Sequence, residues 1–307
     1  MDSFKALLIE ERDGQVVSAI TQMDESRLDA GEVTIRVAYS SVNYKDALAA
    51  TGAGKIIRRF PCIGGIDLSG VVIKSADPRF KEGDPVIATS FDIGVAHHGG
   101  YAEIARVPAD WVVPLPPGLS LYEAMALGTA GFTAALAIVR MEENRLTPAK
   151  GAVIVTGATG GVGSLAVDML AKIGYHVVAL TGKESEAGYL RSLGAAEVMM
   201  RQSIDLTKIR PLDKGRWIAS TMEQGGTIAS IGLAASMKLN TTVAPFILRG
   251  VSLLGIDSGY IREPYRRDVW QRLASDLRPP HLESMSRKIG FEELPATFAE
   301  YVAGRAK

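Results

Sequence analysis

The sequence predicts an α/β protein built from a small, partly open β-barrel and a doubly wound parallel sheet. Between residues 4 and about 115, many short strand-like segments of varying polarity are separated by turn residues, which is typical of a barrel. From residue 121 to about residue 256, helix-like and strand-like segments alternate, as in a doubly wound sheet. Within that alternation, residues 151–174 read as a strand, a glycine-rich turn and a helix.

The barrel region is marked by turn signals. Asp13-Gly14 and Glu82-Gly83-Asp84 are two of them, because Asp and Gly readily adopt the backbone angles of tight turns. A proline-rich connector at 114–120 ends the region, and the pair Ser120 and Glu123 predicts a capped helix from residue 121. The expected strands cover residues 4–11, 16–23, 32–42, 65–74, 85–91 and 100–108.

The glycine-rich turn at 157–163 is the strongest functional motif. The apolar residues 152–155 predict a buried parallel strand before it, and apolar residues at helical spacing follow it. Glycines let the backbone approach a pyrophosphate, and the helix N-terminus offers N–H groups and a positive dipole end. The spacing is Ala158-x-Gly160-x-x-Gly163 rather than three glycines, so a plain turn is the alternative. The position between strand and helix favours a dinucleotide site.

The end of the next predicted strand indicates which dinucleotide binds. An NAD site usually places Asp or Glu about 20 residues past the glycines, where it bonds the ribose 2′-hydroxyl. Here Thr181, Gly182 and Lys183 occupy that place, and Glu184 follows one residue later. A carboxylate repels a 2′-phosphate, whereas a hydroxyl and a cation hold one. These residues therefore favour NADP.

Composition limits the class of partner. The chain has 307 residues, with 34 basic and 34 acidic side chains. Zero net charge argues against nucleic acid or an anionic membrane surface as the main partner, and no apolar run reaches the roughly 18 residues of a membrane helix. The start of the chain reads as a strand and not as a signal peptide, so we expect a cytoplasmic protein. The single cysteine, Cys62, excludes an internal disulfide and a four-cysteine zinc site.

Several motifs together resemble a known family. They are Ser40–Asp46, Gly65–Gly70, Gly128–Ala134, Gly157–Gly163 and Pro245–Val251. In this order and spacing they resemble the zinc-free medium-chain dehydrogenases/reductases. Within that family they are most similar to the acryloyl-CoA reductases, also called YhdH-type quinone oxidoreductases. The likeness runs from the first predicted strand nearly to the last residue.

The resemblance implies an architecture and a set of cofactor contacts. It implies a GroES-like catalytic domain from residues 1–122 and 258–307, an NADP-binding Rossmann domain at 123–257, and a homodimer joined through strands around 252–256. The residues that it implies contact NADPH are Tyr44, Thr129, Thr159, Gly160, Gly161, Val162, Thr181, Gly182, Lys183, Arg201, Leu248 and Ser258.

The zinc ligands of related enzymes are replaced here. Zinc-dependent relatives have a cysteine at the position of Asn43 and a Gly-His-Glu triplet at the position of Gly65–Asp67. The four histidines lack a cysteine or histidine partner at metal-ligand spacing. We therefore expect a reaction without a metal, and we expect His97-His98 to be a solvated pair in a loop.

The implied reaction is hydride transfer from NADPH to the β-carbon of a short 2-enoyl-CoA, with acryloyl-CoA giving propanoyl-CoA. Tyr44 is the catalytic candidate nearest the reacting atoms, and a packed tyrosine near a strand end is the alternative. Asn43 and Asp46 are candidates to orient it or to line the mouth of the site. Cations after this motif, at Lys55, Arg58 and Arg59, are candidates for the CoA phosphates.

Two other functions fit the same sequence. One is an NADPH-dependent reductase of quinones or reactive enones, because fold and cofactor do not separate these substrates. The other is an NADPH-binding protein without turnover. It is favoured by the stretch from Arg201 to Gly225, which is too short for the strand and helix that the family places there. Losing that strand would leave unpaired backbone groups in the middle of a buried parallel sheet, so we expect the full protein to contain a segment that this sequence lacks.

Overall fold

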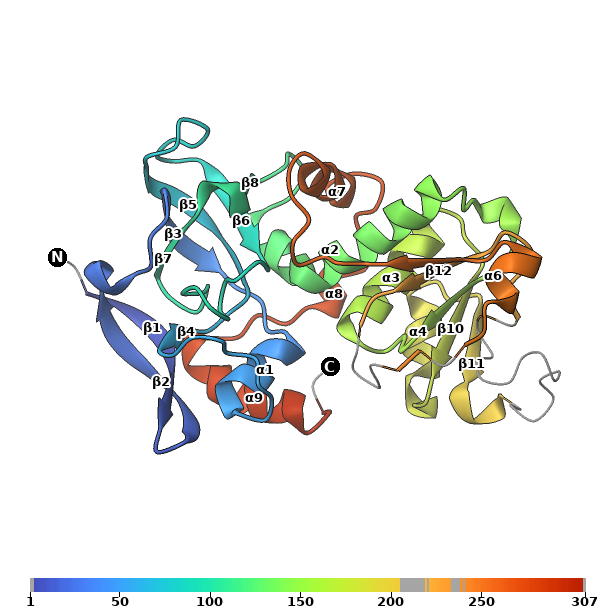
Figure 1. Ribbon diagram of the computed structural model, residues 1–307, viewed down its shortest axis with the longest axis horizontal. Helices are drawn as coiled ribbons and strands as arrows, with labels where there is room; N and C mark the ends of the chain where they lie inside the picture. The colour runs from blue at the N-terminus through green and yellow to red at the C-terminus, as the bar shows by residue number, and fades with distance from the viewer. Residues whose placement is uncertain (1–2, 205–218, 220, 233–237, 240, 306–307) are drawn as a thin grey trace. The chain divides into compact units, whose positions relative to one another are not determined.

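The computed structural model describes residues 3–204, 219, 221–232, 238–239 and 241–305. The chain forms two compact units (Figure 1). The first unit comprises Met1–Phe132, Ser258–Ser275 and Leu282–Lys307, and the second comprises Thr133–Asp257 and Asp276–His281. The domain limits expected from the sequence, 1–122, 123–257 and 258–307, remain a prediction.

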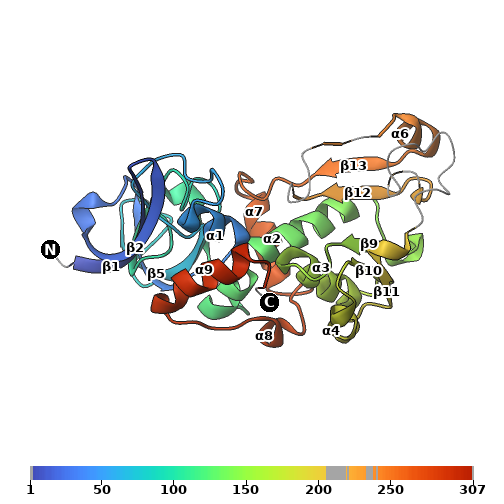
Figure 2. The same cartoon turned by 90° about the horizontal axis from the view of Figure 1, so that it is seen from below.

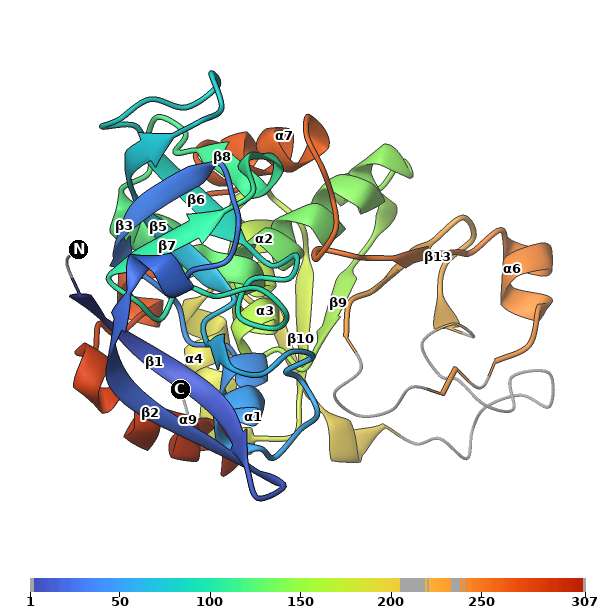
Figure 3. The same ribbon diagram turned by 60° about the vertical axis from the view of Figure 1, so that its left-hand side comes forward.

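The first unit is built on antiparallel strands, as expected for a partly open barrel. A five-stranded sheet has the order β7-β3-β5-β6-β8, and a three-stranded sheet has the order β2-β1-β4. The β1–β2 hairpin (Figure 3) closes on Arg12 opposite Gln15, around Asp13 and Gly14 at positive φ. The strands are β1 (Ser3–Arg12), β2 (Gln15–Asp24), β3 (Val33–Tyr39), β4 (Cys62–Ile63), β5 (Asp67–Ser75), β6 (Pro85–Thr89), β7 (Ile104–Val107) and β8 (Val112–Pro114).

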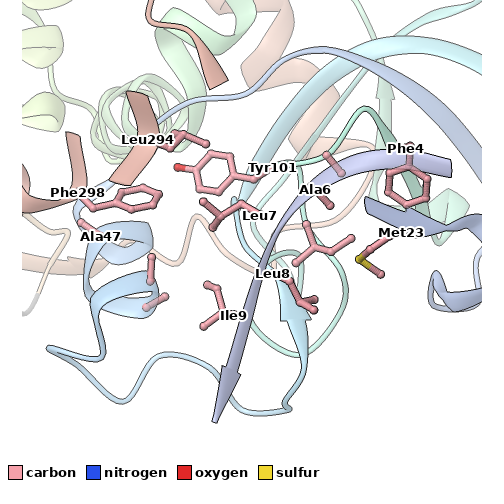
Figure 4. Close-up of a cluster of buried hydrophobic side chains, with 14 of the residues drawn as sticks. Phe4, Ala6, Leu7, Leu8, Ile9, Met23, Ala47, Tyr101, Leu294 and Phe298 are labelled. Carbon is pink, nitrogen blue, oxygen red and sulfur yellow. The ribbon is translucent and has the colours of Figure 1, made fainter. Parts of the chain in front are cut away.

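One hydrophobic core of this unit lies around β1. Leu7 and Ile9 are fully buried in a cluster that also contains Tyr101 and Phe298, whose rings lie 5.8 Å apart (Figure 4). Burying each large side chain contributes about 2 kcal/mol. The cluster joins β1 to a helix near the end of the sequence, because Phe298 lies on α9 (Leu294–Val302). The helices of the unit, apart from α2, are α1 (Tyr44–Thr51), α7 (Tyr265–Leu273), α8 (Leu282–Met285) and α9 (Leu294–Val302).

The long helix α2 (Leu121–Glu143) begins where the capping pattern predicts. The backbone N–H of Ser120 donates to a Glu123 carboxylate oxygen at 2.9 Å, and the N–H of Glu123 donates to the Ser120 hydroxyl at 3.2 Å. Gly128, at φ 49°, interrupts the helical backbone. The helix is long and apolar enough to cross a membrane, but 78% of its most apolar window is buried within the protein.

The second unit contains parallel strands, as predicted. β9, β10 and β11 form a sheet of order β11-β10-β9, and β12 pairs with β13; Figure 2 shows the pair apart from the three-stranded sheet. The strands are β9 (Val153–Thr156), β10 (Val177–Thr181), β11 (Glu197–Met200), β12 (Thr227–Ser230) and β13 (Ser252–Gly255). The helices, besides the end of α2, are α3 (Gly161–Lys172), α4 (Ala187–Ser192) and α6 (Ala244–Arg249).

The burial of β9 differs from the prediction of a buried strand. Ile154 is 37% exposed, and its neighbours Val153 and Val155 are only half-buried. In a complete doubly wound sheet this strand is covered on both faces and paired on both edges. Within the described residues, only β10 pairs with β9. The short stretch between Arg201 and Gly225 lies mostly outside those residues.

The prediction for the histidine pair was wrong, because His97 and His98 are buried. Both are less than 10% exposed. Nδ1 of His98 accepts from the backbone N–H of Ile63 at 3.0 Å, and the backbone N–H of His98 donates to the Asp29 carboxylate at 2.7 Å. The ring of His97 lies edge-on to Trp111. The pair therefore ties three segments of the barrel together.

This burial predicts a loss of stability in mild acid. Burial lowers the pKa of His98, although Asp29 acts in the opposite direction. The folded state then binds fewer protons than the unfolded state, so stability present above about pH 6.5 is lost as the pH falls below it. We expect His98 to contribute a fall in the free energy of unfolding of up to about 1 kcal/mol per pH unit, while Asp46, whose pKa is raised by burial to about 7, acts in the opposite direction over the same range.

Denaturant unfolding between pH 7.5 and 5 measures this effect. The contribution of His98 is the difference between the profiles of the wild type and His98→Gln: the variant should lose less stability than the wild type as the pH falls, whereas His176→Gln, at an exposed histidine, should keep the wild-type profile. A His98→Gln profile parallel to that of the wild type would show that His98 makes no such contribution.

Candidate functional site

The dinucleotide turn connects β9 to α3. Gly157 has φ 60°, and the N–H of Gly160 donates to the carbonyl oxygen of Gly157 at 2.9 Å. A Cβ on Gly163 would lie 2.3 Å from that same oxygen, so only glycine lets the helix approach the turn this closely. The predicted contacts Thr159, Gly160, Gly161 and Val162 lie on the turn and at the start of α3, where helix N–H groups lack intrahelical acceptors.

A second group of predicted residues lies at the ends of β10 and β11. These strands are parallel, and Thr181 pairs with Met200, so Gly182 and Arg201 leave the sheet at the same edge. Nη2 of Arg201 lies 3.4 Å from the position that a Cβ on Gly182 would occupy. Lys183 is exposed beside them. The structure thus brings two cations and a glycine to one corner.

Thr181 shapes this corner from within. It is 4% exposed, and its hydroxyl accepts a hydrogen bond from the backbone N–H of Lys183 at 3.0 Å. The side chain of Gln202 donates to the carbonyl oxygen of Gly182 at 3.2 Å. These bonds fix the turn after β10, so the charge at the corner comes from Lys183 and Arg201.

In the first unit, the carboxylate of Asp67 organises a buried polar cluster that the sequence prediction missed. Oδ2 accepts from the Ser41 hydroxyl at 2.5 Å, from Nδ2 of Asn43 at 2.9 Å and from the backbone N–H of Thr129 at 2.9 Å. Oδ1 accepts from the Thr129 hydroxyl at 2.5 Å. A Cβ on Gly128 would lie 2.8 Å from Oδ2. The cluster therefore requires glycine there and fixes Asn43 and Thr129.

Asp46, predicted to be catalytic, is 2% exposed and does not line a mouth. Its carboxylate accepts from the backbone N–H of Asn43 at 2.8 Å, as a helix-capping residue does, and from the N–H of Ile66 at 3.0 Å. Burial and the Asp67 carboxylate raise the pKa of Asp46 to about 7. Its place in the structure is that of a group that holds Asn43.

Tyr44, at the start of α1, has a different environment. Its side chain is 52% exposed, and among the described residues no hydrogen-bond partner is found for its hydroxyl. A packed tyrosine is therefore ruled out, and the hydroxyl is accessible. Of the weaker predictions, Leu248 on α6 is 71% exposed, and the carbonyl oxygen of Ser258 accepts from Arg266 at 3.0 Å.

Two of the three cations predicted for CoA phosphates have partners. Arg58 forms an ion pair with Asp92 and donates to the hydroxyl of Tyr260 at 3.1 Å. Arg59 forms an ion pair with Asp29. Lys55 is exposed. No group of three or more His, Cys, Asp or Glu side chains in the described part of the chain could hold a metal ion.

A GroES-like unit with the Asp67 cluster, together with a unit carrying a dinucleotide turn, defines an oxidoreductase of the alcohol-dehydrogenase type. The family model for the alcohol dehydrogenase GroES-like domain matches residues 29–117. The acrylyl-CoA reductase AcuI of Ruegeria pomeroyi is 44% identical, with 99% of this chain and 97% of that protein covered. The chain therefore belongs to the family of acrylyl-CoA reductases and YhdH-type oxidoreductases.

Solved structures agree with this assignment. The yhdH oxidoreductase of Salmonella enterica in complex with NADP has a TM-score of 0.93 and 44% identity, covering 99% of this chain and 97% of that one. Bacillus subtilis yhfP with NAD bound has a TM-score of 0.95 and 46% identity, with the same coverage. The two relatives thus differ in their bound cofactor. The alignment with AcuI of Ruegeria pomeroyi spans 322 positions, more than the 307 residues of this chain. AcuI therefore contains internal residues that this chain lacks.

Proposed function

We propose that this protein binds NADPH and reduces the C=C bond of a short 2-enoyl-CoA, acryloyl-CoA giving propanoyl-CoA. The observation that supports NADPH as the cofactor is the grouping of Gly182, Lys183 and Arg201 at the ends of β10 and β11, next to the dinucleotide turn. The names of relatives such as AcuI supply the substrate class. NADPH, when bound, supplies a hydride.

The residues fit this cofactor. Gly160 and Gly161 carry no Cβ where the chain enters α3, which lets a pyrophosphate approach the backbone, and Gly163 lets the helix pack closely against the turn. Two cations at the corner favour a 2′-phosphate over a free hydroxyl, and the carboxylate typical of NAD sites is replaced by Thr181 to Lys183. We therefore assign NADP, although one relative holds NAD.

On the family resemblance, we propose that polar groups held by the Asp67 cluster contact the cofactor. The amide of Asn43 and the hydroxyl of Thr129 are fixed by Asp67, so their directions are set before any ligand arrives. Tyr44 offers an exposed hydroxyl one residue after Asn43. We propose that it donates a hydrogen bond or a proton, directly or through water. No metal takes part in this proposal.

Substrate phosphates need exposed cations. Because Arg58 and Arg59 already pair with Asp92 and Asp29, Lys55 is the better candidate of the three. Reduction of quinones or reactive enones is the second candidate function, since quinone oxidoreductases also occur among the relatives. NADPH binding without turnover is the third, and the half-exposed strand β9 favours it.

One assay separates these functions. NADPH absorbance is followed with acryloyl-CoA, crotonoyl-CoA and a small quinone as oxidants, and NADH replaces NADPH in a parallel series. Rapid consumption with acryloyl-CoA supports the proposal. Consumption with the quinone alone would move the function to the second candidate, and binding without consumption would leave the third.

Replacing Tyr44 by phenylalanine tests its role. We expect kcat to fall at least tenfold, because a positioned proton donor typically contributes a hundredfold or more. Stability should not change, because the hydroxyl is exposed and no partner is found for it among the described residues. Steady-state kinetics and thermal unfolding measure the two effects. Unchanged kinetics in Tyr44→Phe would remove the residue from the mechanism.

We also propose a cytoplasmic homodimer. The family resemblance supports a dimer through the strand at 252–256. The exposed apolar side chains Val243, Ile247 and Leu248 nearby, each more than 70% exposed, are consistent with a covered surface. Light scattering at micromolar concentration tests it, and a monomer mass would contradict it.

A further inference from the structure

The turn that follows β6 has a strained backbone. Ser90 and Phe91 have φ of 64° and 50°, in the left-handed region that residues with a Cβ rarely adopt. Neither is one of the residue types that tolerate this region well. Such strain persists only where surrounding contacts impose it, and it gathers at functional sites. The strand predicted to reach residue 91 therefore ends at Thr89.

Arg266 of α7 supplies contacts that hold this turn. It is 1% exposed, and its Nη1 donates to the carbonyl oxygen and the hydroxyl of Thr89 at 3.2 and 2.9 Å. Its guanidinium lies over the ring of Phe91, 4.5 Å from the centroid. The backbone N–H of Phe91 and Nη2 of Arg266 both donate to the carbonyl oxygen of Gly259, each at 3.1 Å. One buried cation thus holds the backbone and the ring of the turn.

The turn directs the hydroxyl of Ser90 toward Thr129. Oγ of Ser90 lies 3.0 Å from Oγ1 of Thr129, and the backbone N–H of Ser90 donates to the carbonyl oxygen of Ile66 at 2.8 Å. The one hydroxyl hydrogen of Thr129 goes to Oδ1 of Asp67. Ser90 is therefore the donor in the bond between the two hydroxyls. The hydrogen bonds run from Ser90 to Thr129 to Asp67.

We propose that Ser90 is a positioning residue for Thr129 and that Arg266 holds it in the strained turn. Because Thr129 accepts from Ser90 and donates to Asp67, both its rotamer and the direction of its hydroxyl are fixed. Because its hydrogen is donated to Asp67, the hydroxyl of Thr129 contacts the cofactor in this proposal as an acceptor. The inference rests on the contact between Thr129 and NADPH in the proposed function.

Two substitutions separate the hydroxyl from the strain. Ser90→Ala and Ser90→Gly both delete the hydroxyl, but only glycine adopts a φ near 64° without cost. We expect both variants to bind NADPH about fivefold more weakly, as for the loss of one hydrogen bond. Ser90→Gly should unfold about 2 °C above Ser90→Ala. If Ser90 had only a structural role, Ser90→Gly, the more stable of the two variants, would bind NADPH as tightly as the wild type.

Nicotinamide fluorescence titration measures the binding, and a Thr129→Val background tests the route. In that background Ser90→Gly should change the Kd for NADPH by less than about 1.5-fold, because the Thr129 hydroxyl that Ser90 positions is absent. Wild-type affinity in Ser90→Gly, or an undiminished effect in the Thr129→Val background, would overturn the proposal. This experiment measures NADPH binding and not turnover. If the protein fails to reduce acryloyl-CoA, only the proposed substrate is refuted, and the effect of Ser90 on NADPH binding can still be determined.

Arg266→Lys tests the clamp. Lysine cannot reproduce the five bonds that the guanidinium makes to Thr89, Ser258, Gly259 and Ile261. We expect NADPH binding to weaken at least fivefold. Arg267→Lys on the same helix is the matched control, since the side chain of Arg267 is half-exposed and forms an ion pair with Glu263 at 2.9 Å, and the affinity of this variant should stay within twofold of the wild type. If Arg266→Lys does not fold, the Ser90 pair alone decides.

Discussion

Replacing Asp67 by alanine is expected to lower the free energy of unfolding by about 3 kcal/mol or more and to reduce turnover at least a hundredfold. Three donors meet at one carboxylate oxygen, from Ser41, Asn43 and the backbone of Thr129. Asp67 is fully buried, so water does not replace the lost acceptor, and each unsatisfied donor costs about 1–3 kcal/mol. Denaturant unfolding measures the loss.

The loss of turnover follows from the displacement of the two side chains that Asp67 holds. Without the carboxylate, the amide of Asn43 and the hydroxyl of Thr129 lose the group that sets their directions, and a misplacement of about 1 Å costs about a hundredfold in rate. Asp67→Asn keeps one oxygen, so it should fold better than Asp67→Ala and still turn over slowly.

A surface aspartate provides the control for stability. Asp24 accepts from the backbone N–H of Ser26 at 2.8 Å at an exposed cap, and Asp24→Ala should cost much less stability than Asp67→Ala and leave the kinetics unchanged. If Asp67→Ala were no less stable than Asp24→Ala, the cluster would not be what holds this part of the first unit.

The elements that could be predicted from the sequence are those set by neighbouring residues. The hairpin around Asp13-Gly14, the capped start of α2 at Ser120 and Glu123, and the turn before α3 were all predicted, and the structure confirms them. In each case a few adjacent residues determine backbone angles or a local hydrogen bond. Even the corner at Gly182 and Arg201 follows from a rule about strand ends, because parallel strands release their following residues at one edge.

The features that were missed depend on contacts between distant residues. Asp67 bonds Thr129, 62 positions along the chain, and no local pattern marks that pairing. The one signal was that Asp67 occupies a position of the Gly-His-Glu triplet of zinc-dependent relatives. His97 and His98 read as loop residues because they lie among glycines, yet His97 is buried against Ala30 and Trp111 and His98 bonds Asp29 and Ile63. Arg58 and Arg59 read as free cations because their partners lie about 30 residues away along the chain.

The corner at Arg201 yields a second large effect. We expect Arg201→Ala to raise the KM for NADPH about thirtyfold and the Lys183→Ala, Arg201→Ala double variant to raise it several hundredfold, because a charged hydrogen bond contributes about 1.5–3 kcal/mol. The KM for NADH should stay within about twofold, because that cofactor has no 2′-phosphate for the two cations to hold. Kinetics with both cofactors measure the ratio.

The control for this experiment is a second exposed cation of the same unit. Arg191 is an exposed cation on α4 of the same unit, and Arg191→Ala should leave both KM values unchanged if the effect belongs to the corner and not to net charge. Equal losses for NADPH and NADH in Arg201→Ala would mean that the arginine supports the turn after β10 rather than a phosphate. A wild type that prefers NADH would place this chain with the relative that holds NAD, and the two cations would then need another ligand.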